Sequence, residues 1–263
     1  MERATLKLRG AAQRHAAAVD TARRAVEWNG AWVPVSQLSL DVPVSGTVYG
    51  TLLNYQGALA ALGGAVHEPP YQEPPKAPIL YIKPANTHIA CGMPIPCPHG
   101  VDALEMGAAL GIVMGRPATR VPPSEALSYV HGYTIVNDVS IPHASYYRPA
   151  IREKARDGFC PIGPWVVHRE AVPNPDDVGI RVYVNRELRQ ENTTRNLIRA
   201  VPQLIADVTE FMTLSAGDVL LVGVPEGAPL AAVGDTVRIE IDHIGALQNA
   251  IVPEQAQAMG VRA

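Results

Sequence analysis

The 263-residue chain is poor in the features that mark several common protein classes. Its three cysteines, Cys91, Cys97 and Cys160, are odd in number and lack CxxC spacing, which argues against a disulfide framework and a zinc site. We expect reduced, partly buried thiols. Lys and Arg (22) are outnumbered by Asp and Glu (25), so the net charge of −3 gives no basic field for a nucleic-acid partner.

Long apolar segments are also missing. No run approaches the roughly 20 residues that cross a bilayer, so we expect no membrane association. Residues 1–18 are mixed charged and Ala-rich and lack the apolar core of a secretion signal, so we expect a cytoplasmic protein. The eight histidines form no pair at helical i, i+4 spacing, and there is no Gly-x-Ser-x-Gly or P-loop sequence.

What is present favours many short strands. Gly (22) and Pro (24) are spread along the chain, aromatic residues make up 5%, and a hydrophobic content of 47% is enough for a large core. We expect an α+β, mostly β fold. The expected strands are short β-rich runs bounded by Gly, Pro or Asp, at 79–82, 110–114, 133–136, 180–184, 219–222 and 237–241.

Local signals place four further features. Asn29-Gly30 lies between two alternating runs and predicts a hairpin within 24–35. The proline-rich stretch 67–78 predicts an exposed loop. A helix is expected over 125–131, capped by Ser124 and ended by Gly132. A second is expected from Pro202, with Leu204, Ile205, Val208, Phe211 and Met212 on one buried face.

Six segments occur in an order that resembles the fumarylacetoacetate hydrolase family, from about Thr47 to Val252. A longer phrase, YYRPAIREKARDGFCPIG (146–163), narrows the likeness to the amino-terminal half of bifunctional isomerase/decarboxylases of homoprotocatechuate (4-hydroxyphenylacetate) breakdown, or to a separate subunit that corresponds to it. The six segments are IKPANT (82–87), YVHGYTIVNDVS (129–140), KARDGFCPIGP (154–164), VNRELRQENTT (184–194), FMTLSAGDVLLVGVPEG (211–227) and IGALQNAIV (244–252).

The resemblance implies a mixed β-sandwich roll, usually dimeric, that binds Mg²⁺ or Mn²⁺ through three carboxylates. Two come from a Glu-x-Glu strand, whose spacing puts both on one strand face, and the third from an Asn-Asp at a later strand end. The metal would chelate a 2-oxo acid and stabilise an enolate. We divide the chain into an N-terminal arm with a small β element (1–46), the family domain (47–253) and a C-terminal tail (254–263).

This sequence departs from that metal-ligand pattern. Asp138 matches the third carboxylate, but a gap-free count places the Glu-x-Glu positions on Gly107 and Ala109. Strand alternation would keep Glu105 on the same face as Gly107, about 7 Å further along. Glu105 is therefore either an ordinary strand-end carboxylate or a poor substitute ligand. We expect little metal affinity in this chain alone.

Other substrate-side groups are also missing. The family His and Glu that act as general base correspond to Ala58 and Ala61, neither of which can move a proton. Val224 stands where the family usually has a Thr, and it makes no hydrogen bond. His143 lies where active members tend to have Arg-Asp.

Several polar residues of the matching motifs remain. The resemblance implies catalytic roles for Lys154 and Arg156 and substrate-binding roles for Lys83, Arg148 and Gln190. Each also has a structural alternative. Arg189 and Lys83 could pair with carboxylates that hold the sheets together, and Asp138 could be a hydrogen-bonding strand-end residue instead of a metal ligand.

Three functions stay open on these grounds. The first is a subunit of the 5-oxopent-3-ene-1,2,5-tricarboxylate decarboxylase / 2-hydroxyhepta-2,4-diene-1,7-dioate isomerase, binding an anionic 2-oxo acid. Such a chain would form a homodimer, or a heterodimer with a metal-competent subunit of the same fold. The second is a non-catalytic partner in such a heterodimer. The third is a stand-alone acylpyruvate or fumarylacetoacetate-type hydrolase, which would need an activated water without the usual base.

Overall fold

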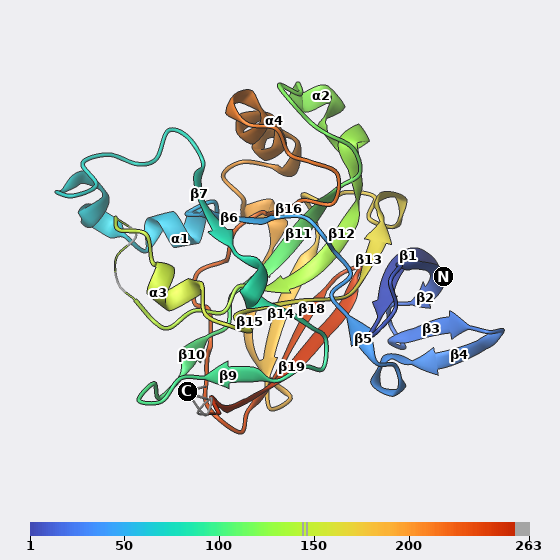
Figure 1. Cartoon of the computed structure of the whole chain (residues 1–263). Helices are drawn as coiled ribbons and strands as arrows, with labels where there is room; N and C mark the ends of the chain where they lie inside the picture. Colours follow the sequence, from blue (N-terminus) through green and yellow to red (C-terminus); the bar gives the residue numbers. More distant parts are fainter. Residues whose placement is uncertain (144, 146, 256–263) are drawn as a thin grey trace, which may run out of the picture.

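A large, strongly twisted sheet forms the centre of the computed structural model, which describes residues 1–143, 145 and 147–255 (Figure 1). Its strands follow the order β4-β3-β2-β1-β13-β12-β11-β16-β6-β7, and β5 and β8 pair with β1 and β13. They span β1 Glu2–Leu8, β2 His15–Asp20, β3 Ala25–Trp28, β4 Ala31–Pro34, β5 Leu40–Asp41, β6 Val48–Leu52, β7 Ile79–Lys83, β8 His88–Ala90, β11 Ala108–Met114, β12 Val130–Asn137, β13 Cys160–His168 and β16 Val219–Leu221.

A five-stranded sheet, in the order β15-β14-β18-β19-β9, packs against one face of the large sheet through contacts of β19 with β13 and of β18 with β12. Strands β10 and β17 form a separate short pair. The bounds are β9 Ile95–Cys97, β10 Leu104–Glu105, β14 Gly179–Val184, β15 Glu187–Thr193, β17 Leu230–Ala231, β18 Thr236–Ile241 and β19 Gly245–Pro253. The predicted mostly β class and the six predicted strands are confirmed.

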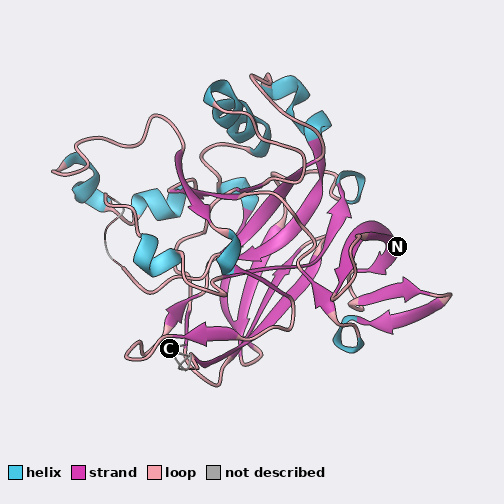
Figure 2. Ribbon diagram, viewed as in Figure 1, coloured by secondary structure: helices cyan, strands magenta, loops and turns pink. Residues whose placement is uncertain are grey.

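The main core lies between the two sheets. Trp165 on β13 is fully buried, and its indole Nε1 donates to the Ile244 carbonyl, 2.8 Å away, next to β19. A second, smaller apolar cluster includes Ala109, Val136 and Ile162 from the large sheet. The short helices lie at the periphery (Figure 2) and span α1 Gln56–Ala60, α2 Pro123–Ala126, α3 Ile151–Lys154 and α4 Val201–Phe211.

The predicted hairpin is present. Strands β3 and β4 pair with Trp28 opposite Ala31, and the two turn residues, Asn29 (φ 52°) and Gly30 (φ 79°), both have positive φ. This is the backbone that a two-residue type I′ turn requires, and Asn-Gly adopts it at low cost. The first strand also docks firmly, because β1 pairs with both β2 and β13.

The first helix prediction was wrong in extent. Helix α2 begins at Pro123, a 3₁₀ turn covers Leu127–Tyr129, and His131 and Gly132 already belong to β12. Ser124 does not cap the helix. Pairing of β12 with β11 and β13 supplies backbone hydrogen bonds on both sides, and this tertiary gain overrides the local helical pattern.

The other local predictions fared better. Helix α4 begins at Val201, and Leu204, Ile205 and Val208 are fully buried as expected. Phe211 is an exception, with 61% of its surface exposed at the end of the helix. Residues 68–78 have no regular structure, although a 3₁₀ turn ends at His67. Among the described residues, no helix is long and apolar enough to cross a membrane.

Candidate functional site

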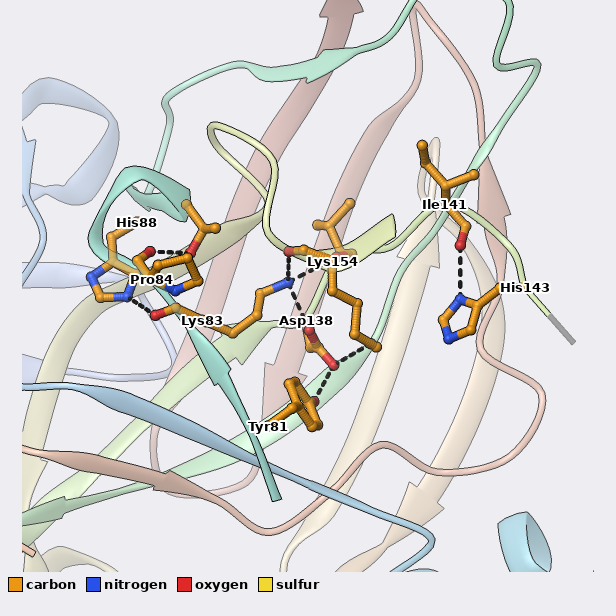
Figure 3. Close-up of polar contacts among 10 residues, drawn as sticks. Tyr81, Lys83, Pro84, His88, Asp138, Ile141, His143 and Lys154 are labelled. Carbon is orange, nitrogen blue, oxygen red and sulfur yellow. Dashed lines mark hydrogen bonds and ion pairs between the residues drawn. The ribbon is translucent and has the colours of Figure 1, made fainter. Parts of the chain in front are cut away.

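The candidate site is centred on Asp138, which directly follows β12. Its side chain is 1% exposed and forms ion pairs with two lysines. Lys83 Nζ lies 2.8 Å from Oδ1, and Lys154 Nζ lies 2.8 Å from Oδ2. The Tyr81 hydroxyl also donates to Oδ2. Figure 3 shows the two lysines and the phenol converging on the carboxylate, with Tyr81 and Lys83 coming from β7 and Lys154 from α3.

Local structure brings these groups together. Tyr81 and Lys83 are two residues apart on β7 and so lie on the same strand face, whereas Ile82 between them is 51% exposed. Lys154 is the last residue of α3. Gly50 is opposite Tyr81 on β6, and a Cβ there would lie 2.0 Å from the Tyr81 ring, so only glycine lets the ring cross the strand.

Lys83 is a structural cation. Its side chain is fully buried, and Nζ donates to the carbonyls of Val139 (2.9 Å) and Lys154 (2.8 Å) in addition to the Asp138 ion pair. The ammonium group thus makes two hydrogen bonds to backbone carbonyls and one ion pair. Burial lowers the pKa of Lys83, and the adjacent carboxylate opposes that shift. Lys83 thus ties the end of α3 to the end of β12.

The electrostatics of Asp138 follow from this arrangement. Burial disfavours its ionised form, but Lys154 and Lys83 together hold the pKa of the carboxyl well below its usual value. Burial and the same carboxylate raise the pKa of the Tyr81 phenol far above its usual value, so the phenol stays neutral and donates. Two ammonium groups and one carboxylate leave one excess positive charge at this point.

A cavity of about 250 Å³ lies beside Asp138. Lys154 and Glu105 line it, and so do Ala58, Ala61 and Val224, the three positions where the sequence lacks polar groups. The remaining lining includes Thr51, Tyr81, His143 and Glu226. The cavity is therefore the place where a substrate would contact the candidate site.

The positions of the missing carboxylates are closed by packing. A Cβ at Gly107 would lie 2.5 Å from the Asp138 carbonyl oxygen and 2.9 Å from Val224 Cγ2. Ala109 is fully buried in the smaller apolar cluster, directly opposite Val136 on β12. The backbone places position 107 beside Asp138, as the gap-free count predicts, but there is no room for a ligand there.

These residues do not fit a divalent cation. Mg²⁺ and Mn²⁺ require about six oxygen ligands, with charge supplied by carboxylates. Both oxygens of Asp138 already face ammonium or phenol groups, and no group of three His, Cys, Asp or Glu side chains able to hold a metal occurs among residues 1–143, 145 and 147–255. Asp138, predicted as a metal ligand, serves here as the acceptor of an ion-pair network.

The other predicted site residues are dispersed. Arg156 pairs with Glu254 at 3.4 Å, away from the cavity lining. Arg148 lines a neighbouring cavity of about 180 Å³. Gln190 is buried and donates to the carbonyls of Pro225 (3.3 Å) and Glu226 (2.6 Å), so it supports a loop of the main cavity.

Two further outcomes concern residues outside the catalytic predictions. Arg189 pairs with Glu187 at the surface (3.3 Å). All three cysteines are unpaired, as expected. The predicted tail lies outside the described residues from position 256 onward.

Sequence reasoning missed Tyr81, Thr51 and Glu226. The signal for Tyr81 was available, because a residue two positions before Lys83 on a strand must share its face. Thr51 follows Gly50 on β6, and only the tertiary structure brings it to the cavity.

Comparison with known proteins agrees with this architecture. The family model described as fumarylacetoacetate (FAA) hydrolase C-terminal matches residues 47–252. The chain belongs to the fumarylacetoacetate hydrolase family. The 4-hydroxyphenylacetate degradation bifunctional isomerase/decarboxylase of Escherichia coli is 40% identical over 212 residues, which cover 81% of this chain and 48% of that protein. The chain spans about half the length of the curated relatives of this kind that it matches.

Solved structures of the family extend the comparison. The 5-carboxymethyl-2-hydroxymuconate delta-isomerase from Mycobacterium smegmatis is 29% identical, with a TM-score of 0.77 over 97% of this chain and 100% of that one. Maleylpyruvate hydrolase from Sphingobium sp. SYK-6, in complex with manganese(II) and pyruvate, is 27% identical, with a TM-score of 0.71 over 86% of this chain and 78% of that one. A divalent metal thus occurs within the family, although the residues of this chain do not fit one.

Proposed function

We propose that this chain is the metal-independent subunit of an isomerase/decarboxylase of aromatic catabolism, working with a metal-competent subunit of the same fold. The observation that carries the proposal is the state of Asp138. Its two carboxylate oxygens face Lys83, Lys154 and Tyr81, and the neighbouring ligand positions are Gly107 and Ala109. A metal-dependent step would therefore take place on the partner.

The extent of the likeness supports a two-part assembly. The chain corresponds to 48% of the bifunctional relative, so a second unit of similar length would complete a protein of that size. We also propose, from the residues at 146–163, that this chain corresponds to the amino-terminal half of the bifunctional relative. A homodimer is the alternative arrangement, and it would lack the metal-competent site altogether.

The cavity supports a role in binding an anionic oxo acid. Lys154 Nζ reaches the cavity with one of its three hydrogens given to Asp138, and Lys83 also pairs with that carboxylate. An ammonium group can bind a carboxylate or an enolate oxygen without a metal. Lys154 is therefore the substrate-binding cation that we assign to this subunit.

A non-catalytic partner subunit is the second candidate. Ala58, Ala61 and Val224 line the cavity where the family motifs carry groups that move or hold protons, and this observation favours loss of turnover. The same substitutions count against a stand-alone C–C hydrolase, because that reaction needs a base to activate water.

Metal titration and activity separate these candidates. We expect no saturable Mn²⁺ binding by calorimetry for the purified chain, and micromolar binding after co-expression with a metal-competent subunit of the same fold. CO₂ release from the oxo-tricarboxylate should require the mixture, and the two chains should co-elute in size-exclusion chromatography. Micromolar binding of Mn²⁺ by the isolated chain would overturn the proposal, and a mixture whose activity is unchanged by Lys154→Ala in this chain would favour the non-catalytic candidate.

A further inference from the structure

Glu105 is a second chemically competent group in the cavity, and the backbone holds it rigidly. It ends β10, where it lies opposite Leu230 of β17. Its amide donates to the Ser140 carbonyl (2.8 Å), and the Ser140 amide donates back to the Glu105 carbonyl (3.2 Å). The residue is thus fixed at the cavity wall, opposite a position two residues beyond Asp138.

The Glu105 carboxyl has properties suited to proton transfer. No hydrogen bond or ion pair engages it within the described part of the chain. Burial raises the pKa of this carboxyl above its usual value, and Lys154 and His143 oppose the shift in part. A carboxyl whose pKa moves toward neutrality can both accept and return a proton at the working pH.

Two other groups would orient a bound molecule in the same cavity. Lys154 Nζ uses one hydrogen on Asp138 and presents its ammonium to the cavity. Thr51 is 2% exposed and lines the cavity, and its buried hydroxyl has no hydrogen-bond partner among the described residues. A buried hydroxyl without a partner is costly unless a ligand or water satisfies it. Glu226 also lines the cavity, where its Oε1 accepts from Asn192 Nδ2 at 3.0 Å and its buried Oε2 has no hydrogen-bond partner among the described residues.

We propose that Glu105 is the proton carrier of a metal-independent keto–enol tautomerisation of a 2-hydroxy-2,4-dienoate, with the oxygen of the enol held by Lys154. The Glu105 carboxylate takes the proton as the enol O–H bond breaks. The C=O bond forms, the conjugated double bonds shift, and the distal carbon takes the same proton from Glu105 to form a C–H bond. One proton moves from oxygen to carbon, so the step needs no oxidant, reductant or co-reactant.

This inference rests on the proposed function, since it assigns the isomerase step to the metal-independent subunit. It explains why the cavity persists although the metal ligands are gone. Tautomerisation needs a proton carrier and a cation for the enolate oxygen, and both are present, whereas C–C cleavage places a larger demand on the stabilising cation.

The test incubates the full chain in EDTA with 2-hydroxyhepta-2,4-diene-1,7-dioate as the probe. The reaction is measured as the rate at which the absorbance of the conjugated diene falls, compared with the rate in buffer without protein. We expect activity in the wild type and a fall in kcat of about a hundredfold or more in Glu105→Gln, the usual contribution of a positioned acid–base group. Glu105→Asp should recover part of the rate. Glu125→Gln, an exposed change on α2, should behave as wild type.

Binding and folding controls keep the outcome interpretable. Glu105→Gln should retain the wild-type melting temperature and the wild-type Kd for a saturated 2-oxo dicarboxylate, which cannot tautomerise through the diene. Wild-type activity that Glu105→Gln leaves unchanged overturns the inference and leaves the proposed function standing. An isolated chain inactive in EDTA, with full isomerase activity in the mixed assembly, does the same. Absence of isomerase and decarboxylase activity from the mixed assembly overturns both.

Discussion

At the scale of single residues, Asp138 is the least replaceable side chain of the site. Asp138→Asn would leave the fully buried Lys83 without its counter-ion, and removing one partner of a buried pair typically costs about 3–5 kcal/mol. We expect a loss of that size in the free energy of unfolding, measured by urea denaturation at pH 7. Asp102→Asn, an exposed change, should have no measurable effect.

Acid titration distinguishes this ion-pair role from simple packing. The folded state holds the pKa of Asp138 below 3.8, its ordinary value, so the stabilisation is complete above about pH 4 and is lost as the pH falls toward the folded-state pKa. The stability difference between the wild type and Asp138→Asn should therefore shrink below pH 4. A difference that stays constant down to pH 3 would contradict the ionic role.

Restoring the two family carboxylates tests whether the metal site lacks only its ligands or also lacks the space to hold them. In Gly107→Glu/Ala109→Glu, the first side chain would have to displace the Asp138 carbonyl and the second would enter an apolar cluster. We expect a protein that is strongly destabilised and shows no saturable Mg²⁺ uptake by calorimetry. Ala61→Glu, which points a carboxylate at the same cavity from its rim, should fold normally. Micromolar Mg²⁺ binding by the double variant would show that the packing around positions 107 and 109 rearranges easily to admit the two carboxylates.

At the scale of elements, the β3–β4 hairpin offers a clean conformational experiment. Gly30 has φ +79°, and no atom lies within 4 Å of the position that a Cβ would take, so Gly30→Ala adds strain without a steric clash. A left-handed backbone costs a non-glycine residue about 1–2 kcal/mol, and we expect a loss of that order in urea unfolding. Gly64→Ala, which has equal space but no positive φ in this range, should be close to neutral.

The elements also show what sequence can and cannot predict. The Asn29-Gly30 turn and α4 follow from local chemistry, so sequence alone located them. The helix expected at 125–131 is shorter than predicted, because Leu127–Tyr129 form a 3₁₀ turn and β12 takes the last two residues into the large sheet. Glu105 was expected to lie on the same strand as Gly107. The strand is interrupted between them, and Glu105 pairs with β17 and Ser140 instead.

At the scale of the whole molecule, the candidate site was predictable only in part. The count from Asp138 back to Gly107 names two residues that lie in contact, and the assignment of position 107 to a family ligand stays a prediction. The groups that surround Asp138 in place of a metal were not predictable. Lys154 comes from α3 and Tyr81 from β7, and these elements lie far apart in the sequence. Long-range packing, which no local pattern encodes, decides whether a lost ligand leaves a hole or a closed contact.

The pairing of β1 with β13 has a consequence for biosynthesis. Ala4 and Thr5 lie opposite Val167 and Val166, so this part of β1 gains its β13 neighbour only after about 160 further residues have been synthesised, whereas Lys7 and Leu8 can pair with β5 much sooner. An unpaired strand edge invites association with other chains. Until β13 emerges, this part of β1 therefore depends on pairing with β2 and β5, or on a chaperone, to stay out of aggregates.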